Sequence, residues 1–237
     1  MQNEIKEKAE QRVRFLFRQE QKQTTRALYE QTFSDGALYT DYYYREKCRD
    51  NVIVVKEELA GGTPRLLCMA HLNPYLYSVC GLPVRVCMLA AVATVPDRRH
   101  EGHMRDVLNA AFDWLSEQGV PFAVLLPVDP AIYSSFGFEK ICGLTEEEPA
   151  VEELAENYDI YTIRDLAARD RRAIALAVEE VMKAAGEEDE GWPENAVIMA
   201  RVTDPAAFDS MAGQTFADDK ARLAWLRSKK ICISDGV

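Results

Sequence analysis

One segment of this chain joins the end of a strand to a basic turn and a helix: Val92-Ala93-Thr94-Val95-Pro96-Asp97-Arg98-Arg99-His100-Glu101-Gly102-His103-Met104. An apolar run of strand length, residues 86–94, overlaps its start, and apolar residues recur at helical spacing from Met104 to Leu115. A turn that opens a helix gathers unpaired backbone N–H groups at the positive end of the helix dipole. The segment therefore predicts a binding site for a phosphate or pyrophosphate.

Two segments resemble a known superfamily. Arg99-x-x-Gly102-x-Met104 after a strand resembles the Arg/Gln-x-x-Gly-x-Gly/Ala acyl-CoA pyrophosphate loop of GNAT N-acetyltransferases, with Met104 in place of the usual small residue. A later segment also resembles the superfamily: Ala131-Ile132-Tyr133-Ser134-Ser135-Phe136-Gly137-Phe138-Glu139. In the superfamily three residues separate a tyrosine from a Gly-Phe pair, and the last core strand follows that pair. The second segment lies at the right distance from the first and strengthens the resemblance.

A fuller resemblance, over roughly the first 142 residues, is to the enhanced-intracellular-survival (Eis-like) acetyltransferases. It rests on Asp41-Tyr42-Tyr43-Tyr44, Met69-Ala70-His71-Leu72-Asn73-Pro74, Ala91-Val92-Ala93-Thr94, Arg98-Arg99 with Gly102-His103-Met104-Arg105, and Ala131-Ile132-Tyr133 with Phe136-Gly137-Phe138. In that family a second GNAT-like region and a sterol-carrier-like domain follow. Residues 197–208 resemble the opening of the latter, but only about thirty residues remain after them, too few for such a domain.

The order of predicted elements agrees with the GNAT order. We expect a strand at 13–17, helices at 22–33 and 38–47, an antiparallel meander over 51–94, a helix at 102–118, a buried strand at 122–126, a short helix at 130–136 and a strand at 138–142. The fully apolar strand after a helix implies a parallel crossover. GNAT proteins splay two parallel central strands apart and bind the pantetheine arm between them.

After residue 143 the composition shifts to an acidic stretch at 146–149, which we interpret as a linker. We expect strands at 158–164, 196–202 and 229–234, helices at 166–185, 205–211 and 218–228, and an acidic loop at 186–194. The expected fold is an α/β (α+β) GNAT acyl-CoA N-acyltransferase fold, a mixed central sheet flanked by helices. We expect a GNAT domain at 1–143 and a small, shortened or degenerate α/β region at 144–237.

The resemblance also implies roles for individual residues. Backbone groups of Val92, Ala93 and Thr94 would pair with the pantetheine arm, and an N–H group at or beside Val92 would hold the thioester oxygen. The pyrophosphate cradle would comprise the backbone N–H groups of Arg99, His100, Glu101, Gly102, His103 and Met104. Arg99 would add charge, and Gly102 would let the backbone approach the phosphates because it has no Cβ. The alternatives are a solvated Arg98-Arg99 pair and an ordinary turn glycine.

Tyr133 is the candidate general acid for the CoA sulfur. A tyrosine with its ordinary pKa of ~10 is protonated at neutral pH, as a proton donor to a thiolate must be. The alternative is a core tyrosine that packs on Phe136 and Phe138.

The general base is open. His71 fits either an acceptor-pocket base acting through water or a hydrogen-bonded structural histidine, while Asp41 and Glu101 are weaker candidates. Eis-like proteins are described as using their C-terminal carboxylate, a role that we do not carry over to Val237. The tyrosines at positions 39 and 42–44 fit core packing with their phenol tips in water, or a substrate wall. His100 and His103 lack a third ligand at suitable spacing, so no metal site is predicted.

Composition narrows the partners and the compartment. The net charge of −11 argues against nucleic acid, which requires a basic face; it suits solubility or the attraction of a cationic amine. The longest apolar runs are shorter than the ~18 residues of a membrane helix, and the polar residues 1–10 do not resemble a secretory signal. We therefore expect a cytoplasmic protein without membrane partners. The six cysteines, without a CxxC pair, are expected to be reduced core residues.

The sequence as a whole favours an acetyl-CoA-dependent N-acetyltransferase that transfers acetyl from the thioester to a primary amine, on a small molecule or a lysine, in a ternary complex. Acetyl-CoA is the expected cosubstrate. The alternative is a non-catalytic acyl-CoA-binding regulatory module. A nucleotide-binding enzyme is disfavoured because no GxGxxG follows a strand. The acceptor amine and the oligomeric state are left open, a homo-oligomer included.

Overall fold

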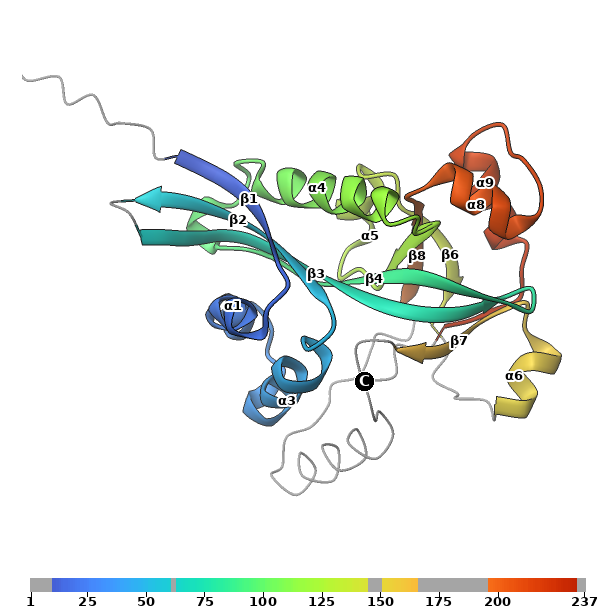
Figure 1. Ribbon diagram of the computed structural model, residues 1–237, viewed down its shortest axis with the longest axis horizontal. Coiled ribbons are helices and arrows are strands. Elements are labelled where there is room, and N and C mark those ends of the chain that lie inside the picture. The colour runs from blue at the N-terminus through green and yellow to red at the C-terminus, as the bar shows by residue number, and fades with distance from the viewer. Residues whose placement is uncertain (1–9, 61–62, 145–150, 166–195, 234–237) are drawn as a thin grey trace, which may run out of the picture.

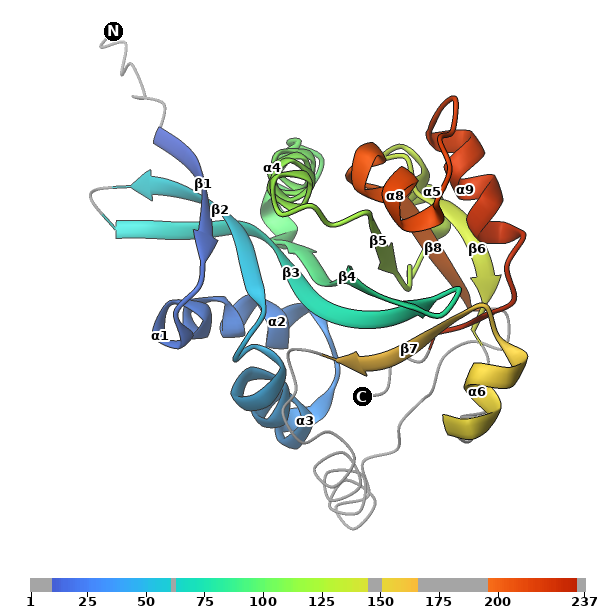
Figure 2. The ribbon, with the colours of Figure 1, turned by 45° about the vertical axis from the view of Figure 1, so that its right-hand side comes forward.

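The computed structural model describes residues 10–60, 63–144, 151–165 and 196–233 as one large mixed sheet with helices on both faces (Figures 1 and 2). The strands are β1 (Glu10–Leu16), β2 (Val52–Ala60), β3 (Thr63–Val79), β4 (Leu82–Thr94), β5 (Phe122–Leu125), β6 (Glu139–Gly143), β7 (Ile160–Asp165), β8 (Val197–Val202) and β9 (Ile231–Cys232). The main strand order is β1-β2-β3-β4-β5-β8-β6, with β7 beside β3 and β9 beside β7. The expected mixed sheet flanked by helices is therefore confirmed.

The predicted helices that fall on the described residues are present with small changes at their ends, and one further helix, at 151–157, was not predicted. They are α1 (Gln19–Lys22), the 3-10 turn η1 (Gln23–Thr25), α2 (Arg26–Thr32), α3 (Gly36–Tyr42), the π-helical turn η2 (Tyr43–Lys47), the 3-10 turn η3 (Pro96–Arg98), α4 (His103–Glu117), α5 (Pro130–Ser134), α6 (Val151–Asn157), α8 (Pro205–Ala212) and α9 (Asp219–Arg227). The linker expected at 146–149, the helix at 166–185 and the acidic loop at 186–194 lie outside the described residues. No helix among the described residues is long and apolar enough to cross a bilayer.

The first four strands form the predicted antiparallel meander. Strand β3 continues through Asn73-Pro74. Pro74 lies between Leu72, the last residue paired with β2, and Tyr75, the first paired with β7. A proline has no N–H to donate, so the change of neighbouring strand is where the sheet tolerates it.

The central strands β4 and β5 are parallel, as the buried strand after a helix predicted. They pair only at Cys87↔Ala123 and Met88↔Val124. Beyond Met88 the remainder of β4 is hydrogen-bonded to β3 on one side and unpaired with β5 on the other. The two strands therefore join at one end and separate at the other.

Residues from beyond the expected boundary at 143 complete this sheet. Strand β8 lies between β5 and β6 and is antiparallel to both, with Ala123↔Arg201 on one side and Glu139↔Ala200 on the other. Figure 2 shows β5, β8 and β6 side by side. The division into domains at 1–143 and 144–237 stays a prediction, but strands from both sides of it belong to one sheet.

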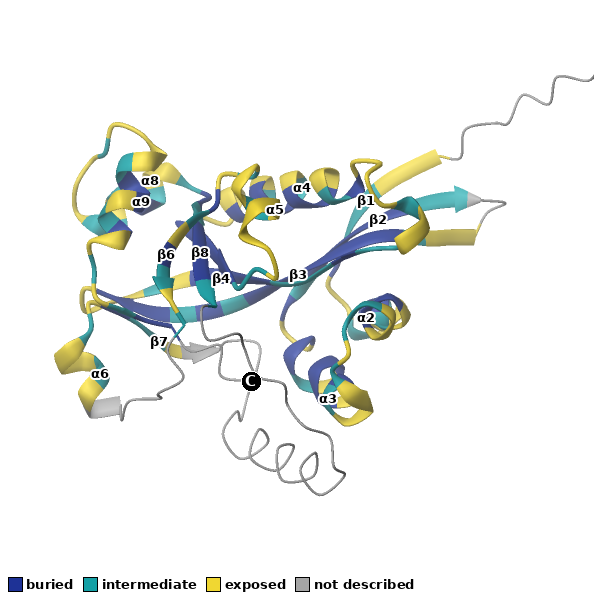
Figure 3. Ribbon diagram, turned by 180° about the vertical axis from the view of Figure 1, so that it is seen from behind, coloured by how far each residue is buried: buried dark blue, intermediate teal, exposed yellow. Residues whose placement is uncertain are grey.

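Helix α4 covers one face of the meander, and α1–α3 cover the other (Figure 1). α4 buries a stripe of apolar residues at helical spacing and exposes its opposite side (Figure 3). The buried stripe consists of Val107, Leu108, Ala111, Phe112 and Leu115. Together with α5 residues and the inner side chains of β3, β4 and β5 it forms what we call the α4-side core.

Two expectations about side chains need correction. Tyr42, Tyr43 and Tyr44 are each at most 5% exposed, so their rings are core residues and their phenol tips do not reach into water. Cys80 is exposed rather than buried, because it lies in the tight turn between β3 and β4 with a φ of +49°. The other five cysteines are buried or half-buried, as expected.

Candidate active site

Strand β4 carries a β-bulge near its end. Its pairing with β3 shifts between His71↔Ala90 and Met69↔Ala93, so that two β4 residues lie opposite one residue of β3. Ala91, inside the bulge, has a φ of +48°, which is rare for a residue with a side chain. A bulge leaves a residue out of the ladder and redirects the backbone groups around it.

The predicted pantetheine-binding residues lie at and after this bulge. Val92 packs toward the α4-side core and Ala93 toward the α1–α3 face, so successive side chains are on opposite sides of the sheet. Thr94 is half-buried and ends the strand. Since β5 does not pair with this part of β4, the outer edge of the strand offers backbone donors and acceptors to a ligand.

The turn after β4 leads into α4 without a capping side chain. His100 and Gly102 have φ values of +65° and +85°, and Gly102 is the N-cap residue. The amide of Asp106 donates to the Gly102 carbonyl at 3.2 Å, which leaves the N–H groups of the preceding first-turn residues unused by the helix. A Cβ on Gly102 would meet no atom within 4 Å, so the space in front of this turn is open.

The two arginines of the turn have different partners. Arg98 donates to Glu58 on β2 at 2.9 Å and to Glu101 at 2.9 Å, and its side chain is mostly covered. Arg99 is exposed, contacts the Thr94 carbonyl at 3.5 Å, and forms no ion pair with any described residue. The solvated-pair alternative is therefore wrong for Arg98, which holds the turn to the sheet, while Arg99 is available to an anion.

The remaining cradle residues divide into exposed and buried ones. His100 and Glu101 are exposed, whereas the His103 side chain is buried with its Nε2 3.1 Å from a Glu101 oxygen. Arg98, and then His103, lower the pKa of the Glu101 carboxyl, which is committed to these contacts and is a poor general base. Met104 packs against the α4-side core, so its long side chain points away from the turn. Its departure from the small residue of the pattern thus leaves the turn open.

Tyr133 lies on α5, half-buried, with its ring edge-to-face against Phe138 at a centroid distance of 6.1 Å. Asp129 caps this short helix by accepting from the Ala131 amide at 2.9 Å, and the Tyr133 carbonyl accepts from Phe136 N–H at 2.9 Å. Burial, with a smaller contribution from Cys68, raises the pKa of Tyr133 to about 12. The phenol is therefore protonated at neutral pH.

Cys68, which the sequence did not single out, contacts the end of β4 and belongs to the same α4-side core that Tyr133 packs against. The Thr94 hydroxyl donates to the Cys68 sulfur at 3.2 Å, and Cys68 is close enough to Tyr133 to affect its pKa. Cys68 lies opposite Thr94 in the sheet register, and this pairing could not be predicted from the sequence because it depends on the bulge in β4.

A family described as the Acetyltransferase (GNAT) domain matches residues 6–141, more than half of the chain. The chain belongs to the GNAT acetyltransferase family. No curated protein matches this GNAT chain.

Solved structures share its fold at low sequence identity. A GNAT family N-acetyltransferase (YhbS) from Escherichia coli in complex with CoA is 17% identical, with a TM-score of 0.50 over 88% of each chain. A probable N-acyltransferase from Enterococcus faecalis V583 is 18% identical, with a TM-score of 0.50, and Eis1 from Mycobacterium abscessus is 14% identical, with a TM-score of 0.43. Each of these two matches 56% of this chain, which spans only about a third of their length. The expected GNAT fold is confirmed.

The candidate bases are all engaged in contacts. Asp41 forms an ion pair with Arg26 at 2.6 Å. His71 is fully buried among tyrosine rings, and its Nδ1 is 3.1 Å from the Tyr43 hydroxyl, while Nε2 has no partner among the described residues. The geometry favours a structural histidine, and burial, with a smaller effect of Lys22, lowers its pKa to about 3.

His71 gives a prediction about stability at acid pH. Its folded pKa of about 3 lies below the ordinary 6.5, so the unfolded chain binds the proton first and stability falls as pH drops below 6.5. We expect the wild type to lose about 2 kcal/mol more unfolding free energy than His71→Asn between pH 7 and pH 5, at 1.36 kcal/mol per pK unit. Urea unfolding at both pH values measures this. Equal losses in the two proteins would contradict it.

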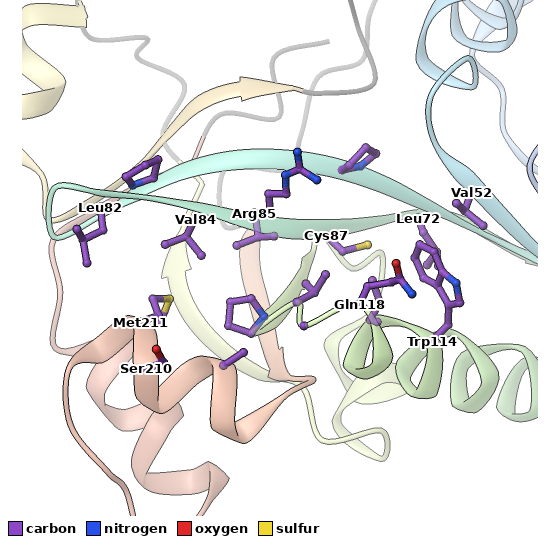
Figure 4. A pocket seen from close by; sticks show the side chains of 18 of the residues that line it. Val52, Leu72, Leu82, Val84, Arg85, Cys87, Trp114, Gln118, Ser210 and Met211 are labelled. Carbon is purple, nitrogen blue, oxygen red and sulfur yellow. The ribbon is translucent and has the colours of Figure 1, made fainter.

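The described residues also line an open pocket away from these groups. It has a volume of about 670 Å³ and lies between the first half of β4, the C-terminal end of α4 and α8 (Figure 4). Trp114, Arg85 and Met211 are among its lining residues, and no predicted site residue lines it. Because the turn at Gly102 is at the other end of α4, this pocket is separate from the candidate active site.

Proposed function

We propose that this GNAT protein transfers the acetyl group of acetyl-CoA to a primary amine by direct transfer in a ternary complex. The observation that carries the proposal is the uncapped N-terminus of α4 behind Gly102, at the end of a bulged strand whose outer edge is unpaired. A helix N-terminus with free N–H groups suits the pyrophosphate, and Arg99 adds positive charge. The Escherichia coli protein that shares the fold holds CoA.

The groups of the candidate site would act at successive steps of the transfer. The neutral amine nitrogen attacks the thioester carbonyl carbon, and the oxyanion that forms is held by an N–H group of β4 at or beside Val92. The C–S bond breaks as the new C–N bond is completed, and the CoA sulfur takes the proton of the Tyr133 hydroxyl. The amine loses its extra proton to solvent, and Tyr133 is reprotonated from solvent. Binding both substrates side by side supplies much of the rate.

Other parts of the proposal concern the setting of the site. We propose that the chain belongs to the Eis-like subfamily, because the segments Asp41–Tyr44, Met69–Pro74 and Arg98–Arg105 resemble it. Residues 1–143 would then be the GNAT domain, and residues 144–237 a shortened C-terminal region that also supplies β8 to its sheet. The net charge of −11 favours a cationic amine as the acceptor substrate and argues against nucleic acid as a partner. The protein would act in the cytoplasm.

Binding and transfer are tested separately. Calorimetry with CoA, acetyl-CoA and NAD measures binding, and mass spectrometry detects acetylated products from polyamines, aminoglycosides and lysine peptides. We expect CoA and acetyl-CoA to bind, NAD not to bind, and at least one amine to gain 42 Da, the mass of an acetyl group replacing a proton. Acetyl-CoA binding without acetylation of any amine would instead favour the non-catalytic acyl-CoA-binding module.

The different partners of the two arginines give a second prediction. Arg99→Ala removes a free cation beside the phosphate turn, so CoA affinity should fall by about 3- to 10-fold, and the loss should shrink at high salt. Arg98→Ala breaks contacts with Glu58 and Glu101 instead. It should lower the unfolding temperature, and it should weaken CoA binding less than Arg99→Ala does. Calorimetry at low and high salt decides the order, and the reverse order would refute the assignment.

A further inference from the structure

Arg201 is a half-buried cation in the middle of β8, beyond the residues that the family matches. Its guanidinium stacks on the ring of Phe112 on α4, 4.0 Å from the ring centroid. Its Nη1 donates a hydrogen bond to the carbonyl of Phe136, in the turn that follows α5. One side chain therefore contacts both the helix that begins at the phosphate turn and the turn behind Tyr133.

The α5–β6 turn is shaped to receive this guanidinium. Gly137 has a φ of +80°, and a Cβ at that position would lie 3.2 Å from Arg201 Nη1. The same turn is tied to the tyrosine, because the Tyr133 carbonyl accepts from the amide of Phe136 at 2.9 Å and of Phe138 at 3.4 Å. A movement of the turn would therefore move α5.

The burial of Arg201 calls for a physical reason. No carboxylate forms an ion pair with it among the described residues, and its Nε is buried without a hydrogen-bond partner there. Burying a cation in this way is costly unless a contact compensates. The ring of Phe112 and the Phe136 carbonyl are the compensating contacts, through a cation–π interaction and a charge-assisted hydrogen bond.

We infer that Arg201 is a positioning residue that holds Tyr133 in place for proton donation, by fixing the α5–β6 turn to α4. The inference rests on the proposed function and adds a contribution from the later part of the chain to it. A proton donor misplaced by a fraction of an ångström loses rate without a matching loss of substrate binding. The predicted signature is accordingly a fall in kcat with a nearly constant KM for acetyl-CoA.

The experiment compares Arg201→Met and Arg201→Lys with a matched control, Arg222→Met. Arg222, on α9, is also largely covered, but it holds Asp209 on α8 at 2.8 Å and Asp219 on α9 at 3.0 Å rather than the α5–β6 turn. We expect Arg201→Met to lower kcat by about 10- to 100-fold with KM for acetyl-CoA within about twofold. Arg201→Lys should recover part of the loss, since it retains the charge but not the planar stacking group. Arg222→Met should lower the unfolding temperature and leave kcat unchanged.

A double variant tests whether Arg201 acts through the tyrosine. Tyr133→Phe with Arg201→Met should have the same kcat as Tyr133→Phe alone, because a positioning residue has no effect once its target has lost the proton. Additive losses would overturn the inference, as would a kcat loss in Arg201→Met no larger than in Arg222→Met.

A spectroscopic measurement separates this inference from the proposed function. In protein labelled with 3-fluorotyrosine, the fluorine signal of position 133 is assigned by its disappearance in Tyr133→Phe. We expect Arg201→Met to shift that signal and Arg222→Met to leave it in place. If the wild type acetylates no amine, the proposed function fails while this signal still reports on the contact. An unshifted signal in Arg201→Met would refute the positioning role even in an active enzyme.

Discussion

Replacing Tyr133 with phenylalanine should lower kcat for acetyl transfer by about 100-fold, the lower end of what a general acid contributes. The variant keeps the ring that packs on Phe138 at 6.1 Å, and it loses only the hydroxyl. Stability and the dissociation constant for CoA should therefore change little. Steady-state kinetics and calorimetry measure the two quantities. Tyr158→Phe, at another half-buried tyrosine that lies beside Lys230, is the matched control and should keep full activity.

The pH dependence of the same reaction tests the protonation state. If Tyr133 had the ordinary tyrosine pKa of ~10, it would lose its proton as the pH rises, and kcat would fall with a midpoint near pH ~10. Burial raises the pKa of Tyr133 to about 12, so the donor form persists to higher pH. Between about pH 9 and pH 10.5, kcat of the wild type should therefore not fall through loss of this proton. A decline with a midpoint near 10 that is absent from Tyr133→Phe would contradict the raised pKa.

Gly102→Ala should weaken CoA binding by about tenfold, equivalent to about 1.4 kcal/mol. Gly102 has a φ of +85°, and its missing Cβ faces open space in front of α4. Alanine strains this backbone and places a methyl group where the proposed phosphates approach the N–H groups. Calorimetry with CoA at one fixed salt concentration measures the change.

The opposite end of α4 supplies the control. Gly119 has a φ of +67° and open space around its missing Cβ, so Gly119→Ala brings a similar backbone strain without approaching the proposed site. Both variants should lose about 1–2 kcal/mol of stability, the usual cost of a side chain in this conformation. CoA affinity should stay within about twofold in Gly119→Ala. If both variants weakened CoA binding equally, the turn at Gly102 would not be the phosphate cradle.

Local patterns predicted most elements well, because they depend on residues close together in the sequence. The apolar stripe of α4 and the buried run of β5 both follow from side-chain periodicity. The π-helical turn at Tyr43–Lys47 and the change of strand partners at Pro74 were not predicted. Both depend on neighbouring segments: the tyrosines pack under the sheet, and Pro74 lies where β3 changes partners.

The candidate site shows the same division between near and distant contacts. Arg98 and Arg99 are chemically identical in the sequence, but Arg98 pairs with Glu101 in the same turn and with Glu58, forty residues earlier, and Arg99 with neither. Met104 departs from the small residue of the motif, but its half-buried side chain packs against the α4-side core and does not fill the turn. A single arginine inside the apolar segment 197–202 was the one available signal for Arg201, but its contacts with Phe112 and Phe136 could not be inferred from spacing.

The sequence by itself determined that a strand, a glycine-containing basic turn and a helix follow one another, because each depends on side-chain periodicity and backbone preference over a few residues. Only the tertiary structure decided that β4 and β5 pair at one end and separate at the other, and that β8 lies between β5 and β6. It also decided that the Arg201 side chain contacts the turn after α5. These features depend on pairing and burial between segments tens of residues apart. The stability of such pairing and burial depends on which groups come into contact, and the local sequence does not specify those contacts.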